Sequence, residues 1–286
     1  MPHTVTKLVL SNNSPKLVYR FPWLLRLQHI ASWLMTLRLW YCRRESRRIL
    51  LNKTHSKSFL EAGCGSGELL FSLSRRFKSG EFVGIDINEE SVNIAGKYCY
   101  SRNIKNVSLE MSGIDDFKSD LSFDAISCIS VLQYVSNPDK SFIHLLKMLG
   151  ENGKLLIYLP VDDKRVLPGY NYLRKSWFRP VVYDSYKEVN YKLTEPEIKR
   201  IIHENDAQID KLSYTYDWAG KIGYELISFG QLFILRVNWI LAFLFAIVYF
   251  PIILLPAWLF MLMDMILPKK RGNGILLTIS RLTTTA

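Results

Sequence analysis

An uninterrupted apolar run near the carboxyl terminus constrains this chain of 286 residues more than any other feature. From Val237 to Met263 there are 27 residues without a charged side chain, and Pro251 and Pro256 lie inside the run. As one helix the run would extend about 40 Å, whereas a bilayer core is about 30 Å thick and each span takes about 20 residues. The run is therefore long for one membrane span, too short for two, and difficult to bury in a small domain.

The net charge of +11 is concentrated at the opposite end of the chain. The segment Met1–Lys57 holds eleven lysines and arginines and one acidic residue. Within it, residues 17–40 combine tryptophan and leucine with arginine, and an arginine cluster follows at 43–48. This composition is typical of a helix that lies on a membrane surface, and it also fits an amphipathic helix that packs on a domain with its arginines in water. We predict a basic, aromatic, amphipathic helical arm over residues 1–57 and leave both placements open.

Between these ends, residues 58–217 alternate short apolar runs with helical patterns. Strands are predicted at 58–62, 81–86, 107–111, 123–129, 153–159, 209–216 and 274–281. Helices are predicted after the glycine-rich turn at 65–67, after the cap Asn88, from Asn137–Pro138, and from the capping box that begins at Thr194. The alternation favours an α/β fold with a doubly wound, mostly parallel sheet.

The four cysteines are widely spaced and form no C-x-x-C pair. A disulfide scaffold and a structural zinc site are therefore disfavoured, and a reducing cytosolic compartment is expected. No cluster of histidine, cysteine and acidic residues has metal-ligand spacing, so we predict no metal.

The segment Phe59–Glu68 reads as a strand, a glycine-rich turn and a helix start, with the sequence F-L-E-A-G-C-G-S-G-E. Glycines let the backbone pass close to a ligand, and a helix amino terminus offers unpaired N–H groups. A dinucleotide fingerprint would have its third glycine where Glu68 stands, and Glu61 before the first glycine suits a ligand with an amino group. With V-G-I-D at 83–86 and the runs at 123–135 and 151–160, the turn resembles the class I, Rossmann-like family of S-adenosylmethionine (SAM)-dependent methyltransferases.

The resemblance covers about residues 58–216 and the last strand, and it implies that SAM is the cofactor. In that family the acidic residue and the glycines of the turn hold the methionine part of SAM, and the acid that ends the second strand, here Asp86, holds the ribose hydroxyls. Ile114 would pack on the adenine ring and Asp115 or Asp116 would accept its N6 amine, while Gly113 stands where the family often has Asp. The predicted cofactor residues are Glu61, Gly63, Cys64, Gly65, Gly67, Asp86, Ile87, Ile114, Asp115 and Ser130.

Candidates for catalysis are few, because methyl transfer from a sulfonium needs mainly alignment of the acceptor behind the methyl group. Many relatives carry a histidine after the fourth strand, where this chain has Gln133 and Tyr134. Tyr134 is the candidate for orienting the acceptor. Asp162 and Asp163 follow the fifth strand at the expected substrate rim, where solvation is the simpler interpretation.

The resemblance also places the apolar run between the sixth and seventh strands, within an insert of residues 218–273. A chain that leaves and re-enters one cytosolic sheet crosses a membrane an even number of times, and two spans do not fit. We therefore expect a seven-stranded Rossmann-like domain of residues 58–217 and 274–286, with an apolar helical hairpin that dips into one leaflet and turns near Pro251–Pro256. Basic residues on both flanks, such as Lys221 and Lys269, favour the cytoplasmic side for both ends.

These features together predict a methyltransferase that is monotopic or peripheral on the cytoplasmic face of a membrane. Its expected partners are an anionic membrane surface and a hydrophobic or lipid-linked acceptor, such as a lipid, quinone, isoprenoid or acylated aromatic. Two alternatives stay open: a soluble small-molecule methyltransferase whose insert is a lid or a dimer interface, and a non-catalytic SAM-binding membrane scaffold. A nucleic-acid methyltransferase is disfavoured because the arm is apolar and no N-P-P-Y-type motif is present.

Overall fold

The computed structural model describes residues 22–53, 57–161, 164–168, 170, 193–234 and 237–282. A seven-stranded sheet with the order β3-β2-β1-β4-β5-β7-β6 forms its centre. Only β7 runs antiparallel to its neighbours β5 and β6, as the predicted methyltransferase-like topology requires. The strands are β1 (Ser58–Ala62), β2 (Glu81–Asp86), β3 (Val107–Met111), β4 (Phe123–Ile129), β5 (Leu149–Pro160), β6 (Ala207–Thr215) and β7 (Gly274–Arg281). The predicted α/β fold is confirmed.

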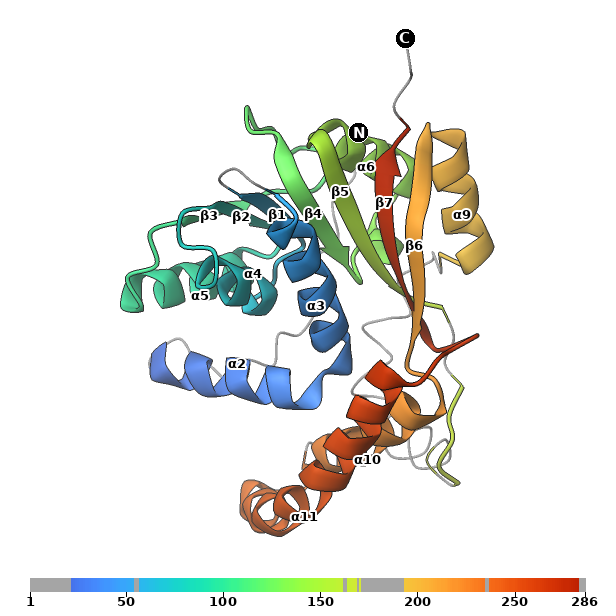
Figure 1. Cartoon of the computed structure of the whole chain (residues 1–286). Helices are drawn as coiled ribbons and strands as arrows, with labels where there is room; N and C mark the ends of the chain where they lie inside the picture. The colour runs from blue at the N-terminus through green and yellow to red at the C-terminus, as the bar shows by residue number, and fades with distance from the viewer. Residues whose placement is uncertain are drawn as a thin grey trace, which may run out of the picture.

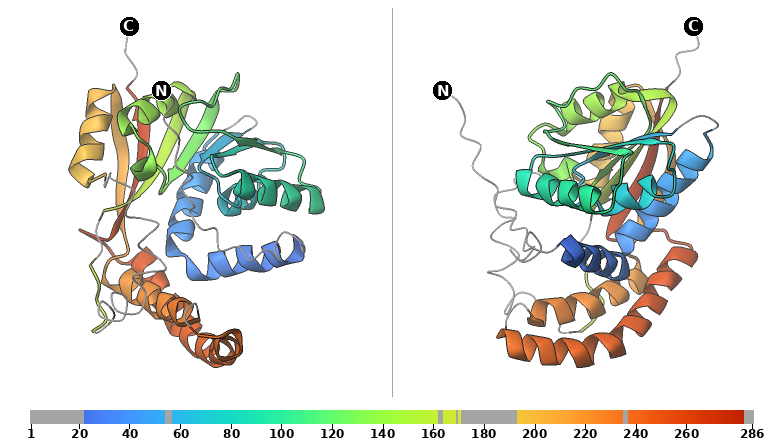
Figure 2. Two further views of the ribbon diagram at one scale, coloured as in Figure 1. Left: turned by 180° about the vertical axis from the view of Figure 1, so that it is seen from behind. Right: turned by 90° about the vertical axis from the view of Figure 1, so that its left-hand side faces the viewer.

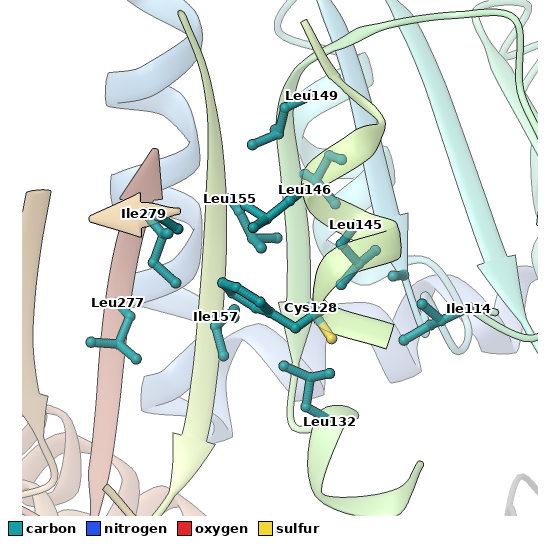
Figure 3. Close-up of a cluster of buried hydrophobic side chains, with 14 of the residues drawn as sticks. Ile114, Cys128, Leu132, Leu145, Leu146, Leu149, Leu155, Ile157, Leu277 and Ile279 are labelled. Atoms are coloured by element: carbon teal, nitrogen blue, oxygen red, sulfur yellow. The ribbon is translucent and has the colours of Figure 1, made fainter. Parts of the chain in front are cut away.

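Helices cover both faces of this sheet (Figures 1 and 2). One face carries α3 (Leu37–Leu51), α4 (Glu68–Ser74) and α5 (Glu89–Ser101), and the other carries α6 (Pro138–Lys147) and α9 (Glu195–Glu204). The predicted caps form, since the side chains of Asn88, Asn137 and Thr194 accept backbone N–H bonds at the starts of α5, α6 and α9. Figure 3 shows the core beneath α6, where Leu145 and Leu146 meet strand residues such as Leu155 and Ile157.

The arm folds onto the domain. Helix α2 (Pro22–Met35) contacts α4 and α5, and α3 buries Leu37, Tyr41 and Leu50 against β4 and β5. Of the two placements left open by the sequence, the described part of the arm takes the packed one. Residues Leu27 and Ile30 of α2 still point outward and are 52% and 45% exposed.

The insert between β6 and β7 is a pair of packed helices, α10 (Trp218–Ile234) and α11 (Trp239–Ile266). The predicted turn at Pro251–Pro256 is wrong, because both prolines lie inside the 28-residue helix α11. Helix α10 instead ends at Ile234 and α11 begins at Trp239, so the two helices of the pair are separated before the prolines and not at them. Figure 2 shows α11 as one continuous helix that runs beneath the domain, with α2 between it and the sheet.

A buried carboxylate joins this helix pair to the domain. Asp264 is 1% exposed and lies near the end of α11. Its Oδ1 accepts the N–H groups of Asp217 (2.9 Å) and Gly220 (3.2 Å) at the start of α10, and its Oδ2 accepts the N–H of Tyr216 (3.1 Å) after β6. The hydroxyl of Tyr41, from α3, donates to Oδ2 over 2.9 Å. One side chain therefore ties α11 to α10, to the end of the sheet and to the arm.

Candidate active site

The turn between β1 and α4 has a backbone that requires glycine at three positions. Gly63, Gly65 and Gly67 have φ angles of +77°, +52° and +82°, a region that other residues adopt only with strain. A Cβ atom at Gly63 would collide with Val131, and one at Gly67 would lie 2.5 Å from the ring of Phe71. At Gly65 a Cβ would meet nothing within 4 Å, so the backbone there borders open space. The turn is therefore a cradle that a ligand can approach closely at Gly65.

Two carboxylates accept backbone hydrogen bonds from this turn and the residues near it. Glu61 is 5% exposed, and its Oε2 accepts the N–H of Leu70 over 2.9 Å. Burial raises the pKa of Glu61 well above 4.5, and the nearby charges of Glu68 and Asp86 raise it further. Asp86 accepts the N–H of Gly65 (2.8 Å) and, with its other oxygen, that of Asn88 (2.9 Å). Each oxygen of Asp86 keeps a second lone pair. A ligand that brings an ammonium group and vicinal hydroxyls, as SAM does, suits this pair.

The predicted adenine residues lie at two depths. Ile87 follows β2 with 70% of its surface exposed, whereas Ile114 is 6% exposed and belongs to the core cluster of Figure 3. Asp115 is engaged elsewhere, because it accepts a 2.6 Å hydrogen bond from Ser141 and lies 3.5 Å from the ammonium of Lys140.

Its neighbour Asp116 lies close to Gly113. A Cβ atom built on Gly113 would lie 3.3 Å from the Oδ2 atom of Asp116 and 3.7 Å from Ile87. The carboxylate of Asp116 therefore lies close to the place where the side chain of an aspartate at position 113 would begin. We therefore prefer Asp116 to Asp115 as the acceptor for the adenine amine.

The arm packs beside the glycine-rich turn. These contacts were not predicted from the sequence. The Nε2 atom of His29 lies 3.0 Å from the carbonyl oxygen of Ser66, and Ser32 donates to Glu68 over 3.3 Å. His29 is 4% exposed, its ring lies 4.7 Å from that of Tyr98, and burial lowers its pKa from 6.5. The signal was present, because positions 25, 29 and 32 share one face of a helix that begins at Pro22 and buries Leu25.

The arm also reaches the carboxyl ends of β4 and β6. Arg38, the second residue of α3, donates its backbone N–H to the hydroxyl of Tyr216 (3.0 Å) and a guanidinium N–H to Ser130 (3.4 Å). Ser130 and Tyr216 have φ angles of +56° and +55°. Such strain in residues other than glycine clusters at functional sites. The structure thus brings the predicted Ser130 together with Arg38 and Tyr216, which the sequence did not single out.

Tyr134 is half-buried in the short helix Leu132–Tyr134, and its N–H donates to the carbonyl of Val131, the residue above Gly63. Cys64 is buried within the turn. Asp162 and Asp163 lie outside the described residues. The loop that follows them is bound to α10, because Glu225 accepts the N–H groups of Val166 (2.9 Å) and Leu167 (2.7 Å). The described residues contain no group of three or more metal-ligating side chains.

Sequence comparison matches this chain to one family. Residues 53–218, more than half of the chain, match the family described as a methyltransferase domain. A curated relative is the ubiquinone biosynthesis O-methyltransferase of Rickettsia akari, which is 28% identical over 98 residues, 34% of this chain and 38% of that protein. The matches to the first curated relatives span between 28% and 44% of those proteins' own lengths.

Solved structures share the fold at low identity. The plantazolicin methyltransferase BpumL, in a complex with a monoazolic analogue and SAH, aligns with a TM-score of 0.52 and 18% identity over 87% of this chain and 84% of its own. The [4+2]-cyclase SpnF aligns with a TM-score of 0.53 and 16% identity over 84% and 81% of the two chains. One of these two proteins is named a methyltransferase and the other a cyclase. Their similarity to this chain therefore establishes its fold and not its activity.

Proposed function

Because the chain belongs to the methyltransferase-domain family and SAM is its cofactor, we propose that it methylates a hydrophobic or lipid-linked acceptor at the cytoplasmic face of a membrane. The observation that carries the location is an exposed apolar stripe along α11. It is formed by Ile240, Leu241, Phe243, Leu244, Ile247, Val248, Ile252, Leu255, Leu259, Leu262, Met263 and Ile266. Single residues or adjacent pairs recur at intervals of about one helical turn, which places them on one side of the helix.

The area of this stripe is sufficient for membrane attachment. Fully burying one side chain of this size contributes about 1.5–3 kcal/mol. Ile252 and Leu255 are 65% and 63% exposed, so each contributes roughly 1–2 kcal/mol if it enters the acyl region. Four such side chains therefore supply about 4–8 kcal/mol. In water the same stripe is a large exposed apolar patch, which soluble monomers rarely maintain.

The stripe lies at the end of the sheet where the acceptor must arrive. Parallel sheets bind ligands at the carboxyl ends of their strands. Helix α10 starts three residues after β6, and Glu225 within it holds the loop after β5. Figure 1 shows the α10–α11 pair below these strand ends. An acceptor dissolved in the membrane would reach the site along this side, without crossing water.

The chain's own residues then have the following proposed roles. Bound SAM supplies an electrophilic methyl group. Glu61 pairs with the ammonium and Asp86 with the ribose, while Asp116 and Ile114 hold the adenine. Arg38, beside Ser130, neutralises negative charge on the acceptor or on the SAM carboxylate, and Tyr134 orients the acceptor.

The test is methyl transfer from labelled SAM to extracted membranes, with mass spectrometry of the labelled lipids. Two variants separate location from chemistry. Asp86→Ala is expected to lose SAM binding and remain in the membrane pellet after an alkaline wash. The combined variant Ile252→Asp, Leu255→Asp and Leu259→Asp, all on the stripe, is expected to bind SAM normally and move to the soluble fraction.

Three results would contradict the proposal. Recovery of the unmodified protein in the soluble fraction defeats the membrane location. If the soluble protein is also a dimer that the stripe variant converts to monomers, α11 is a dimer interface instead. SAM binding without any labelled product would favour a non-catalytic scaffold.

A further inference from the structure

Beside the end of α11 lies a groove that the proposed reaction does not use. It has a volume of about 690 Å³, and its lining includes Trp33, Trp40, Arg43, Arg44, Arg47 and Met265. We call it the arginine groove. It lies between the end of α2, the outer side of α3 and the last turn of α11.

Three arginines of this groove, Arg43, Arg44 and Arg47, form no ion pair with a carboxylate of the described residues. Arg48 at the groove's edge does pair with a carboxylate, that of Glu45 at 3.4 Å. The guanidinium of Arg43 lies 5.0 Å from the centre of the Trp33 ring, and that of Arg44 lies 5.3 Å from the ring of Tyr41. These stacking contacts orient the cations and leave their charge uncompensated. The protein thus concentrates positive charge without neutralising it.

The covered parts of the same side chains also lack acceptors. The Nε–H groups of Arg43 and Arg47 are shielded from solvent and have no hydrogen-bond acceptor among the described residues. Burial and the neighbouring charges of Arg47 and Arg75 lower the pKa of Arg43. A bound anion would pair with the terminal N–H groups of these arginines, which are not among the covered atoms, and would compensate their charge, since arginine binds phosphate with paired N–H donors.

The position of the groove selects among possible anions. Met265 lines it and also belongs to α11, whose exposed stripe ends at the adjacent Ile266. Exposed Lys270 and Arg271 follow directly. With the stripe in the acyl region, the arginine groove would lie at the depth of the lipid headgroups, where tryptophan and arginine are favoured.

We propose that the arginine groove binds the phosphate of an anionic phospholipid headgroup. The inference rests on the proposed membrane location and adds a site that selects the lipid. In this arrangement α11 supplies apolar attachment, and the arginine groove fixes the rotation of the domain by holding one headgroup at the junction of α2, α3 and α11.

The experiment is flotation of the full chain with vesicles of phosphatidylcholine and with vesicles of an equal phosphatidylcholine–phosphatidylglycerol mixture. Arg43→Gln, Arg44→Gln and Arg47→Gln are combined in one variant. A basic residue near an anionic surface is worth about 1 kcal/mol, so this variant should lose about a hundredfold in affinity for the mixed vesicles. Its binding to phosphatidylcholine and to SAM should not change.

The matched control is Arg76→Gln, Arg102→Gln and Lys105→Gln, which removes three exposed charges from another part of the domain. Because it changes the net charge equally, a loss as large as that of the groove variant would show that only overall charge matters, and would overturn the site. Equal binding of the unmodified protein and the groove variant to mixed vesicles would also overturn it.

Two further outcomes identify another ligand or another failure. Inorganic phosphate at millimolar concentration is added as a competitor. If it abolishes binding to the mixed vesicles, and if its own affinity for the protein equals that of the vesicles, the site takes free phosphate and the lipid assignment is wrong. If the unmodified protein binds neither kind of vesicle, the proposed membrane location fails together with this inference. Binding to both vesicles without a groove effect leaves that location intact and refutes the groove alone.

Discussion

The substitution Asp264→Asn tests whether one carboxylate attaches the apolar helix pair to the seven-stranded domain. The change keeps the shape of the side chain and removes its charge. Asp264 now accepts three backbone N–H groups and one hydroxyl while it is 1% exposed. An asparagine oxygen can keep the two bonds from Asp217 and Gly220, but its NH₂ group would face the N–H of Tyr216.

The expected loss of stability follows from these bonds. One unsatisfied buried N–H costs about 1–3 kcal/mol. Hydrogen bonds to a charged group are worth about 1.5–3 kcal/mol each and are about twice as strong as neutral ones, so the two retained bonds lose roughly half their value. The free energy of unfolding should therefore fall by about 2.5–6 kcal/mol, a large part of the ~5–15 kcal/mol typical of a domain.

Urea unfolding in a mild detergent, followed by tryptophan fluorescence, measures this change. Asp120→Asn is the control, because Asp120 is exposed and its substitution should leave the unfolding midpoint within error. An Asp264→Asn protein as stable as the unmodified one would refute the role of Asp264 as the attachment point.

Two pH-dependent effects are also expected. Burial raises the pKa of Glu61 above 4.5, and a bound ammonium group favours the ionised form of its carboxyl. The affinity for SAM, measured by calorimetry, should therefore increase as the pH rises through this raised pKa. The variant Glu61→Gln should bind SAM more weakly at high pH, and its affinity should not depend on pH in this way. Burial lowers the pKa of His29 from 6.5, so below that pH the unfolded chain takes up a proton that the folded chain does not, and the free energy of unfolding should decrease. In urea titrations His29→Gln should lack this decrease, and an unchanged decrease in that variant would exclude His29 as its source.

The sheet could be predicted from the sequence because each strand is a short apolar run ended by turn or capping residues. The ranges predicted for β1, β2, β3, β4 and β7 agree with the structure, and β5 starts earlier, at Leu149. Such buried central strands depend on local composition and on neighbours that the βα alternation already fixes.

Residues of the candidate site could be predicted from the sequence only where they belong to a recognisable motif. The glycine-rich turn and Asp86 were predicted in this way, and the structure places them together, since Asp86 accepts the N–H of Gly65. Arg38 and His29 belong to a segment whose composition gave two interpretations, and they reach the site only because α2 and α3 fold back across it. Long-range packing of this kind leaves no spacing signal at the site itself, so it could not be derived from the turn.

The turn wrongly predicted at Pro251–Pro256 in α11 has a physical explanation, and the sequence contained the signal for it. Proline removes a backbone N–H and disfavours a helix interior, which suggested a turn at Pro251–Pro256. Helix α10, however, presents glycines toward α11: a Cβ at Gly223 would lie 2.8 Å from the carbonyl oxygen of Ala257, and one at Gly230 would overlap the ring of Tyr249. Small residues let two helices approach closely, and neighbouring helices hold a proline-containing helix together in apolar surroundings. The repeat of these glycines at positions 220, 223 and 230 was the signal that α11 would continue through both prolines against a partner.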